Sequence, residues 1–191
     1  MGFLDVIRGK RQIKQAAPTD RVFAMTTAQV TLEMTLGLKS KGTSAIVFQP
    51  LATADFEQIV RDMEEVVRSS GEETGTTIET SDDDFGYRWM ILRDPDFEDL
   101  VVGLNAVSTA LEAGGYGDRI LAAVFPFADE AGASVYWIYN YKRGAFYPFV
   151  PASGAQQRDN ERELRLKAQI GGELPIEAEL ERWFPLWGIP I

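Results

Sequence analysis

The strongest constraint on the fold is a succession of three short, mostly apolar and aromatic-rich segments that short connections separate. These segments are 119–127, 134–142 and 145–150. Short apolar runs bounded by turn residues are typical of β-strands, and short connections join antiparallel neighbours. Arg143 and Gly144 predict a two-residue turn between the last two strands. Because Pro148 has no backbone N–H to donate, we predict that the third strand lies at an edge of the sheet.

Three more strands are expected ahead of this meander. Segments 76–80 and 85–93 flank the acidic turn Asp82–Asp84, so they predict a β-hairpin. The unbroken apolar segment 44–49 predicts a strand that is buried on both faces. Together, the six segments predict one antiparallel sheet of about six strands.

Two intervening segments carry apolar residues at every third or fourth position, which is the spacing of one helix face. The clearer one is 54–68, and Thr53 is placed to cap its N-terminus. The other is 97–113, which the glycines at 114 and 115 bring to an end. Both helices are predicted to pack on the sheet.

Segment 26–38 fits both a strand and a helix, and we favour a helix that ends near Gly37. The remaining predictions are a polar helix at 157–169, a short helix that begins near Pro175 and ends at Pro185, and loops at 39–43 and 69–75. Helices segregated from antiparallel hairpins indicate an α+β fold, with the helices packed on one sheet.

Missing residue types exclude several kinds of catalytic site. The 191 residues include no Cys and no His. The chain therefore has no thiol nucleophile, no thiolate or imidazole metal ligand and no Ser-His-Asp triad. The carboxylates Asp82–Asp84 lack the ligand spacing of a calcium loop and are better explained as a solvated turn. We expect a protein that is not an enzyme, with no catalytic residues, no metal and no cofactor.

The net charge is −10, and it is unevenly distributed along the chain. An acidic chain is not expected to bind nucleic acid, because phosphate contacts need clustered Lys and Arg. No stretch approaches the roughly 20 apolar residues of a membrane-spanning helix, so we expect a cytoplasmic protein. Residues 1–21 nevertheless carry +3, which leaves −13 for the rest of the chain.

This basic beginning predicts a separate functional segment. We divide the chain into a basic amphipathic leader and linker, 1–18, and a single α+β domain, 19–191, with a helical, apolar C-terminal tail. A short basic amphipathic helix can lie on a membrane surface or contact a partner, and it can also pack on its own domain. The candidate contact residues of the leader are Phe3, Leu4, Ile7, Arg8, Lys10 and Arg11.

Two aromatic clusters are the candidate partner-binding sites, since aromatic residues are enriched at protein interfaces. They comprise Trp137, Tyr139, Tyr141, Phe146 and Tyr147 in the hairpin 134–149, and Trp183, Phe184 and Trp187 near the C-terminus. Alternation places Trp137, Tyr139 and Tyr141 on one face of the sheet. Lys142 and Arg143 at the hairpin turn suit an acidic partner. The alternative interpretation is a solvated turn, with both aromatic clusters covered by the chain itself.

Several segments resemble, in their order and spacing, the PspA-associated protein PspAB family of phage-shock-type operons in actinobacteria and some archaea. They are MGFLD at the start, AQVTLEMTLGLK at 28–39, FGYRW in the first predicted hairpin, NAVSTALEAGGYG at 105–117, YKRGAFYPFVP at 141–151, QQRDNERELR at 156–165 and RWFPLWGIP at 182–190. The resemblance implies association with PspA, a membrane-remodelling coiled-coil protein of envelope stress, and supplies no catalytic residues. The hairpin–helix–hairpin order is also similar to the YbjN and type III secretion chaperone-like fold, whose members bind peptide segments.

We therefore expect a non-enzymatic adaptor or regulatory partner in a PspA-type envelope (membrane) stress response. Its partner would be PspA or another phage-shock component, bound through the aromatic hairpin and the C-terminal tail, with weak peripheral membrane contact by the leader. Two alternatives stay open. One is a peptide-binding chaperone for another client, and the other is a hydrolase that uses paired carboxylates or a metal.

Overall fold

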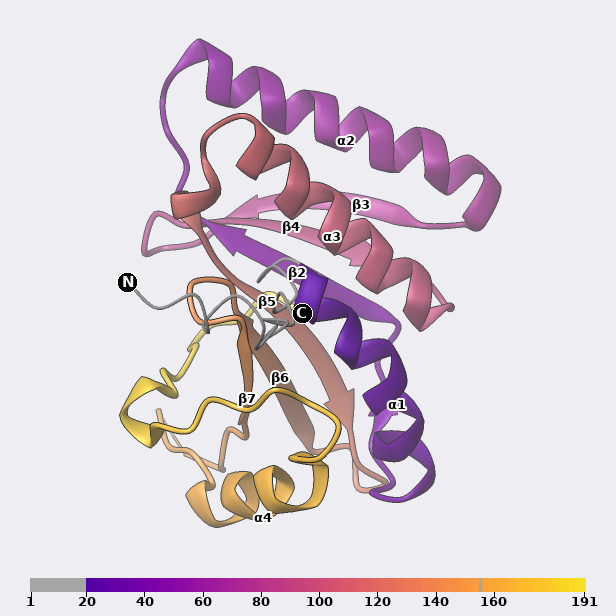
Figure 1. Cartoon of the computed structure of the whole chain (residues 1–191), viewed down its shortest axis with the longest axis vertical. Coiled ribbons are helices and arrows are strands. Elements are labelled where there is room, and N and C mark those ends of the chain that lie inside the picture. The colour runs from indigo at the N-terminus through magenta and orange to yellow at the C-terminus, as the bar shows by residue number, and fades with distance from the viewer. Residues whose placement is uncertain (1–19, 155) are drawn as a thin grey trace, which may run out of the picture.

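A single antiparallel sheet organises the part of the chain that the structure describes, residues 20–154 and 156–191 of a computed structural model (Figure 1). Its order is β3-β4-β2-β5-β6-β7, and β1 pairs with β5 beside that path. The strands are β1 (Lys39–Ser40), β2 (Thr43–Phe48), β3 (Thr77–Asp82), β4 (Arg88–Arg93), β5 (Ile120–Ala128), β6 (Ser134–Asn140) and β7 (Ala145–Phe149). The predicted α+β fold and the hairpins β3–β4, β5–β6 and β6–β7 are confirmed.

Helices cover one face of this sheet, which we call the helix face. They are α1 (Ala24–Met34), α2 (Ala54–Thr74), α3 (Phe97–Ala113) and α4 (Asn160–Ile170), with short 3-10 helices η1 (Asp20–Phe23) and η2 (Gly117–Arg119). A further 3-10 helix, η3 (Leu180–Arg182), lies in the C-terminal segment. Figure 1 shows α2 and α3 side by side over the β2–β4 end of the sheet, whereas α4 lies at the opposite end, near β7.

The helix face holds the larger hydrophobic core. Phe97 of α3 packs on Phe125 and Phe127 of β5, with ring centroids 5.9 and 5.6 Å apart. Trp137, Tyr139 and Tyr141 are buried in the same core, so the prediction that they share a face is confirmed. At α2, the predicted cap is also confirmed, because the Thr53 hydroxyl accepts a hydrogen bond from the backbone N–H of Phe56.

The opposite face of the sheet is covered in part by the C-terminal segment 171–191, which we call the tail; we call this the tail face. The tail wraps around the edge strand β7. The N–H of Phe146 donates to the Pro175 carbonyl at 2.7 Å, and the N–H of Glu177 donates to the Phe146 carbonyl at 2.9 Å. Beyond this crossing, Trp183 stacks on Tyr147 with centroids 6.1 Å apart. The predicted edge position of β7 is confirmed.

Several local predictions were wrong, for identifiable reasons. The predicted loop 69–75 belongs mostly to α2, which continues to Thr74 and ends only where Gly75 adopts a left-handed φ of 94°. The turn between β6 and β7 has four residues, Tyr141–Gly144, rather than two. Lys39–Ser40 form β1 instead of a loop. The segment 175–185 has only the 3-10 turn η3, because its first residues pair with β7.

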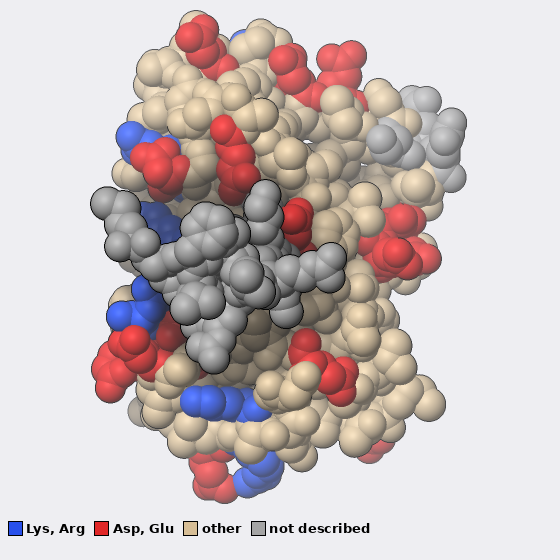
Figure 2. Space-filling view, in the orientation of Figure 1, with Lys and Arg blue, Asp and Glu red and all other residues tan. Residues whose placement is uncertain are grey.

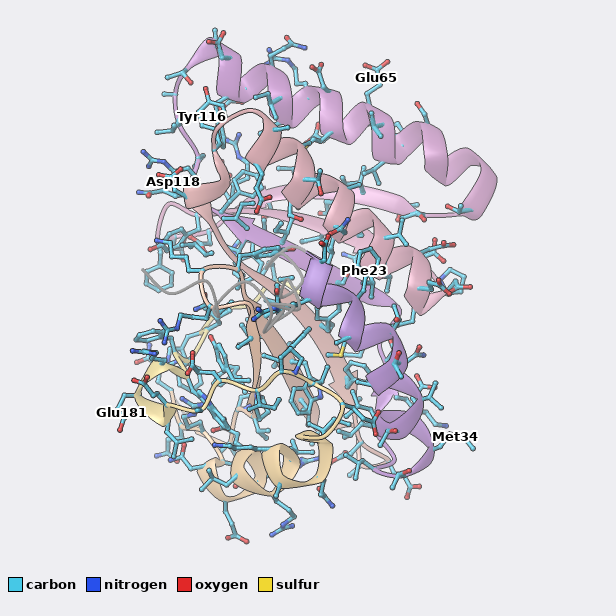
Figure 3. The ribbon with its side chains drawn as sticks, viewed as in Figure 1. Phe23, Met34, Glu65, Tyr116, Asp118 and Glu181 are labelled. Atoms are coloured by element: carbon cyan, nitrogen blue, oxygen red, sulfur yellow. The ribbon has the colours of Figure 1, made fainter. Side chains whose placement is uncertain are left out.

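Acidic residues concentrate on two helices. Of the chain's net −10, α2 contributes −5, from seven Asp or Glu and two Arg, and α3 contributes −3, from three Asp or Glu and no Lys or Arg. On the side of the molecule in Figure 2, several carboxylates lie in the upper part of the view, over these helices, and others are spread over the rest of that side. Glu65 projects outward from α2 in Figure 3.

The predicted leader, 1–18, lies outside the described residues. Within the described ranges, none of the helices is long and apolar enough to cross a bilayer.

Candidate functional site

An apolar groove of about 500 Å³ opens on the tail face, between the β3–β4 turn and the tail. We call it the tail groove. Val47, Trp89 and Tyr147 supply buried parts of its floor from three different strands. Phe85 of the turn and Phe184 of the tail line it and are 71% and 58% exposed. An apolar floor with large exposed aromatic residues beside it is the kind of surface at which proteins bind other chains.

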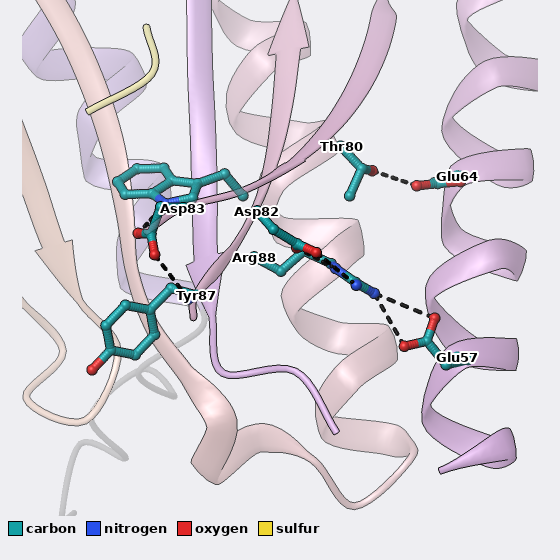
Figure 4. A network of polar contacts seen from close by, with 8 residues as sticks. Glu57, Glu64, Thr80, Asp82, Asp83, Tyr87 and Arg88 are labelled. Carbon is teal, nitrogen blue, oxygen red and sulfur yellow. Dashed lines mark hydrogen bonds and ion pairs between the residues drawn. The ribbon is translucent and has the colours of Figure 1, made fainter. Parts of the chain in front are cut away.

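The turn that forms one wall is held by Asp83 (Figure 4). One carboxylate oxygen accepts hydrogen bonds from the backbone N–H groups of Phe85 and Tyr87, both at 2.9 Å. The other oxygen accepts the indole N–H of Trp89, also at 2.9 Å. This single carboxylate therefore fixes both the wall and the orientation of the indole in the floor.

A second set of contacts ties the same hairpin to α2 (Figure 4). The guanidinium of Arg88 donates to Asp82 at 2.7 Å and to Glu57 at 3.2 Å. The hydrogen bond from Arg88 lowers the pKa of Asp82. Asp82 and Asp83 thus have structural partners, and among the described residues no group of three or more Asp, Glu, His or Cys is arranged to hold a metal ion.

The tail wall is anchored by side chains that donate to its backbone. The Tyr147 hydroxyl donates to the Phe184 carbonyl at 3.0 Å, and Arg158 donates to the Trp183 carbonyl at 2.6 Å. The Trp183 indole in turn donates to the Glu177 carbonyl at 3.0 Å. Burial raises the pKa of Tyr147, so its hydroxyl stays a neutral donor at physiological pH. These bonds hold the backbone next to the groove.

Arg158 is itself held by a buried carboxylate. Its Nε lies 3.0 Å from both oxygens of Glu163, which is only 2% exposed. Glu163 also accepts the backbone N–H of Val150 at 2.9 Å. Burial raises the pKa of Glu163, while the hydrogen bonds from Arg158 and Val150 oppose that shift. One ion pair therefore connects α4, the end of β7 and the tail.

The two basic residues of the β6–β7 turn, Lys142 and Arg143, have different surroundings. Arg143 donates to Glu177 at 3.1 Å, and Arg182 pairs with Glu179 at 2.7 Å. Burial alone would raise the pKa of Glu177, but hydrogen bonds from the Glu179 N–H and from Arg143 lower it. Arg143 is thus engaged within the chain. Its exposed neighbour Lys142 lines the polar end of the tail groove.

The structure places the predicted partner-binding residues in three groups. Trp137, Tyr139, Tyr141 and Phe146 are buried on the helix face, and Tyr147 and Trp183 are buried on the tail face. Phe184, Trp187 and Lys142 line the tail groove, as does part of Tyr147. The predicted leader contacts, Phe3, Leu4, Ile7, Arg8, Lys10 and Arg11, lie outside the described residues.

Sequence reasoning missed the whole turn wall of the groove, because segment 85–93 was assigned to a strand from its first residue. Phe85 and Tyr87 instead belong to the turn, and β4 begins at Arg88. The available signal was a large apolar residue, Phe85, directly after three consecutive Asp residues. Polar residues are usual in such a turn, so an aromatic ring there indicates a contact or an exposed binding residue.

The comparisons with known proteins give one match. A family model described as PspA associated protein B matches residues 1–191, the full length of the chain. Neither the curated proteins nor the solved structures gave a match. The similarity to the YbjN and type III secretion chaperone-like fold stays a prediction.

Proposed function

The chain belongs to the PspA associated protein B family, and on that premise we propose that it is a non-enzymatic adaptor in a PspA-type envelope-stress system. Its partner in this proposal is PspA or another phage-shock component. The partner inserts an extended apolar segment into the tail groove. The family name supports a link to PspA-type systems, and the groove supplies a surface suited to such contact.

The observation that carries the proposal is the pair of exposed rings, Phe85 and Phe184, on either side of a buried apolar floor. Leaving two aromatic rings in water costs free energy that a partner's apolar side chains recover on binding. The groove volume of about 500 Å³ lies within the usual range for ligand sites. Lys142 and Asn140 at its polar end favour a segment that carries a carboxylate beside its apolar residues.

The arrangement also bears on the rival hypothesis of a hydrolase. Acid–base chemistry by carboxylates requires two that converge on one substrate position. Asp83 is the one carboxylate among the described residues that line the tail groove, and three donors already occupy its oxygens. The groove therefore favours binding over hydrolysis.

A pull-down with purified PspA tests the proposal. Wild-type protein should recover PspA, and the double variant Phe85→Ser/Phe184→Ser should recover at least about tenfold less, because interface aromatic residues contribute disproportionately to affinity. Met34→Ser is the matched control, since Met34 is a large exposed apolar side chain on α1, outside the groove. Thermal melts should show that all the proteins are folded.

Two outcomes contradict the proposal. Failure of the wild type to recover PspA, under conditions that recover other PspA partners, would reject this partner. Equal recovery by the wild type and the Phe85/Phe184 variant would reject the tail groove as the site. If cross-linking from the groove instead captured an unrelated client, the peptide-binding chaperone hypothesis would replace the adaptor.

Weak membrane contact by the leader is a separate proposal, supported by the +3 charge of residues 1–21. Each basic residue near an anionic surface contributes about 1 kcal/mol. Co-sedimentation with anionic vesicles should therefore decrease when residues 1–15 are deleted. Unchanged co-sedimentation would reject this contact.

A further inference from the structure

A second apolar groove runs along the helix face, between α2 and α3, and we call it the helix groove. One part encloses about 320 Å³ and is lined by residues that include Ile59, Val66, Ala106 and Gly114. A smaller part of about 110 Å³ continues from it past Val102. Both parts share Val66 and Ala106, so they form one depression along the two helices.

The groove is long and its walls are apolar. On α3 it extends from Asp99 to Gly114, a length of about 22 Å at the helical rise per residue, or roughly four helical turns. Val66 and Val102 stand at its opening and are 59% and 48% exposed. Ala106 is also exposed, so the α3 wall is low and a third helix can approach closely. A groove of this length between two helices accommodates a third α-helix of about four turns.

Two carboxylates line this apolar strip, Asp62 on α2 and Asp99 on α3. Glu65 on α2 and Glu98 and Glu112 on α3 are further exposed carboxylates of the same two helices, outside the groove lining. None of the ion pairs between described residues involves any of these five. Partial burial, followed by repulsion from neighbouring carboxylates, raises the pKa of Asp99.

The charge of these two helices accounts for −8 of the net −10 (Figure 2). Like charges three or four residues apart on a helix repel one another, as Asp62 and Glu65 do on α2. A cationic ligand removes this repulsion and adds attraction, whereas an acidic ligand is excluded. Charge complementarity thus identifies the kind of helix that fits.

We propose that the helix groove binds a basic amphipathic helix of about 15 residues, four helical turns, supplied by a protein partner. The apolar stripe of that helix contacts Val66 and Val102. Its Lys and Arg side chains meet Asp62 and Asp99 along the rim. This surface lies on the opposite side of the sheet from the tail groove, so the adaptor has two independent binding surfaces. The proposal for either groove can fail without affecting the proposal for the other.

The first test uses a defined probe, a fluorescein-labelled 15-residue helical peptide of Leu and Lys in amphipathic order, and a Leu/Glu peptide as its counterpart. The full-length protein should bind the Lys peptide and not the Glu peptide in fluorescence anisotropy. Asp62→Lys/Asp99→Lys should weaken binding about tenfold, because two attractive contacts become repulsive. Phe85→Ser/Phe184→Ser should bind the peptide as the wild type does.

The matched control reverses two exposed carboxylates elsewhere, Asp84→Lys/Glu130→Lys. It changes the net charge equally and should alter the affinity less than about twofold. Equal weakening by both double variants would show that the peptide responds only to net charge, and it would overturn the proposal. Absence of binding to the wild type would also overturn it.

The second test identifies the occupant in cells. A photo-cross-linking amino acid replaces Val102, with the same replacement at exposed Val30 of α1 as control. A cross-link from Val102 that maps to a basic amphipathic helix of another protein, and that is lost with Asp62→Lys/Asp99→Lys, supports the proposal. Cross-links to residues 1–18 of this chain, to a second copy or to lipid would overturn the assignment to a partner, as would labelling no stronger than at Val30.

Discussion

The two grooves lie on opposite faces of one sheet and differ in what forms their walls. The tail groove is walled by a turn and by tail residues 184–187, which form no helix or strand, and side-chain hydrogen bonds to backbone groups hold both walls. The helix groove is walled by two regular helices, whose backbone hydrogen bonds are internal. The tail groove presents aromatic rings and few charges, whereas the helix groove is apolar with an acidic rim.

This contrast teaches that two sites on a small domain can have different sensitivities. The walls of the tail groove depend on a few anchoring side chains, so single substitutions should open it. Binding in the helix groove depends on the summed charge of its carboxylates, so ionic strength should control the affinity. The experiments below exploit these differences, beginning with the largest expected effect.

The largest effect should come from the Arg158–Glu163 pair, which anchors the tail. Arg158→Met leaves Glu163 buried without its ion partner and should lower the free energy of unfolding by about 3 kcal/mol. Urea denaturation at neutral pH measures this loss. The same variant should weaken PspA recovery more than it weakens binding of the Leu/Lys peptide, since Arg158 positions the tail wall.

An exposed ion pair on the same helix provides the control. Arg165 pairs with Glu161 at 2.6 Å, but both side chains are well exposed, so Arg165→Met should cost less than about 0.5 kcal/mol. The double variant Arg158→Met/Glu163→Leu should regain part of the loss, because no unpaired charge stays buried. Similar losses for Arg158→Met and Arg165→Met would contradict the anchoring role.

Salt should separate the two grooves next. Raising NaCl from about 0.05 M to about 0.5 M shortens the screening length several-fold, so affinity for the Leu/Lys peptide should decrease about tenfold. Recovery of PspA through the tail groove should change less than about twofold, because apolar burial is not screened. Anisotropy titrations and quantitative pull-downs at both salt concentrations provide the comparison. Parallel salt responses would mean that one electrostatic surface binds both ligands.

A smaller effect should follow from loss of one tail hydrogen bond. Tyr147→Phe removes the donor to the Phe184 carbonyl and should cost about 1 kcal/mol of stability. Tyr116→Phe is the helix-side control: Tyr116 packs on Phe56, and none of the hydrogen bonds between described residues involves its hydroxyl. The urea midpoint should fall more for Tyr147→Phe than for Tyr116→Phe. A larger loss of stability for Tyr116→Phe would contradict the role of the Tyr147 hydrogen bond.

The sequence predicted the regular part of both faces. Alternation placed Trp137, Tyr139 and Tyr141 on one face, and the missing N–H of Pro148 placed β7 at an edge. These predictions succeeded because they depend on local properties, side-chain periodicity and a missing backbone donor, which the sequence displays directly. The α+β class followed from the order of the elements.

The sequence did not predict the groove walls, because they depend on contacts between distant residues. Nothing local shows that Phe85 of the turn faces Phe184 of the tail, nearly one hundred positions later. The conformation of the tail was likewise missed, since pairing of Ile176 with Phe146 overrides the helix signal of Pro175. The polar end of α2 was predicted to be a loop. The helix instead continues through Gly71 and ends at Gly75.

The smallest effect should appear in the pH dependence of stability, where Glu177 near the tail and Asp99 by the helix groove have opposite pKa shifts. The pKa of Glu177 is lowered on folding, so its stabilisation is present above its ordinary value and is lost as the pH falls through the lowered value. The pKa of Asp99 is raised, so its ionisation opposes folding, and stability decreases as the pH rises through the raised value.

Two variants with uncharged side chains should therefore change the pH dependence of stability in opposite directions. Between about pH 3 and pH 7, which spans ordinary carboxyl pKa values, Glu177→Gln should lose less stability on acidification than the wild type, and Asp99→Asn should lose more. Urea midpoints at the two pH values measure both slopes. Carboxyl NMR titration of the wild type is the independent check, because it should place Glu177 below and Asp99 above their ordinary pKa values. A slope of the same sign for both variants would contradict the opposite pKa shifts of the two groups, because burial and the charges of Asp94 and Asp96 raise the pKa of Asp99, whereas at Glu177 burial is outweighed by hydrogen bonds from the Glu179 N–H and Arg143, which lower the pKa.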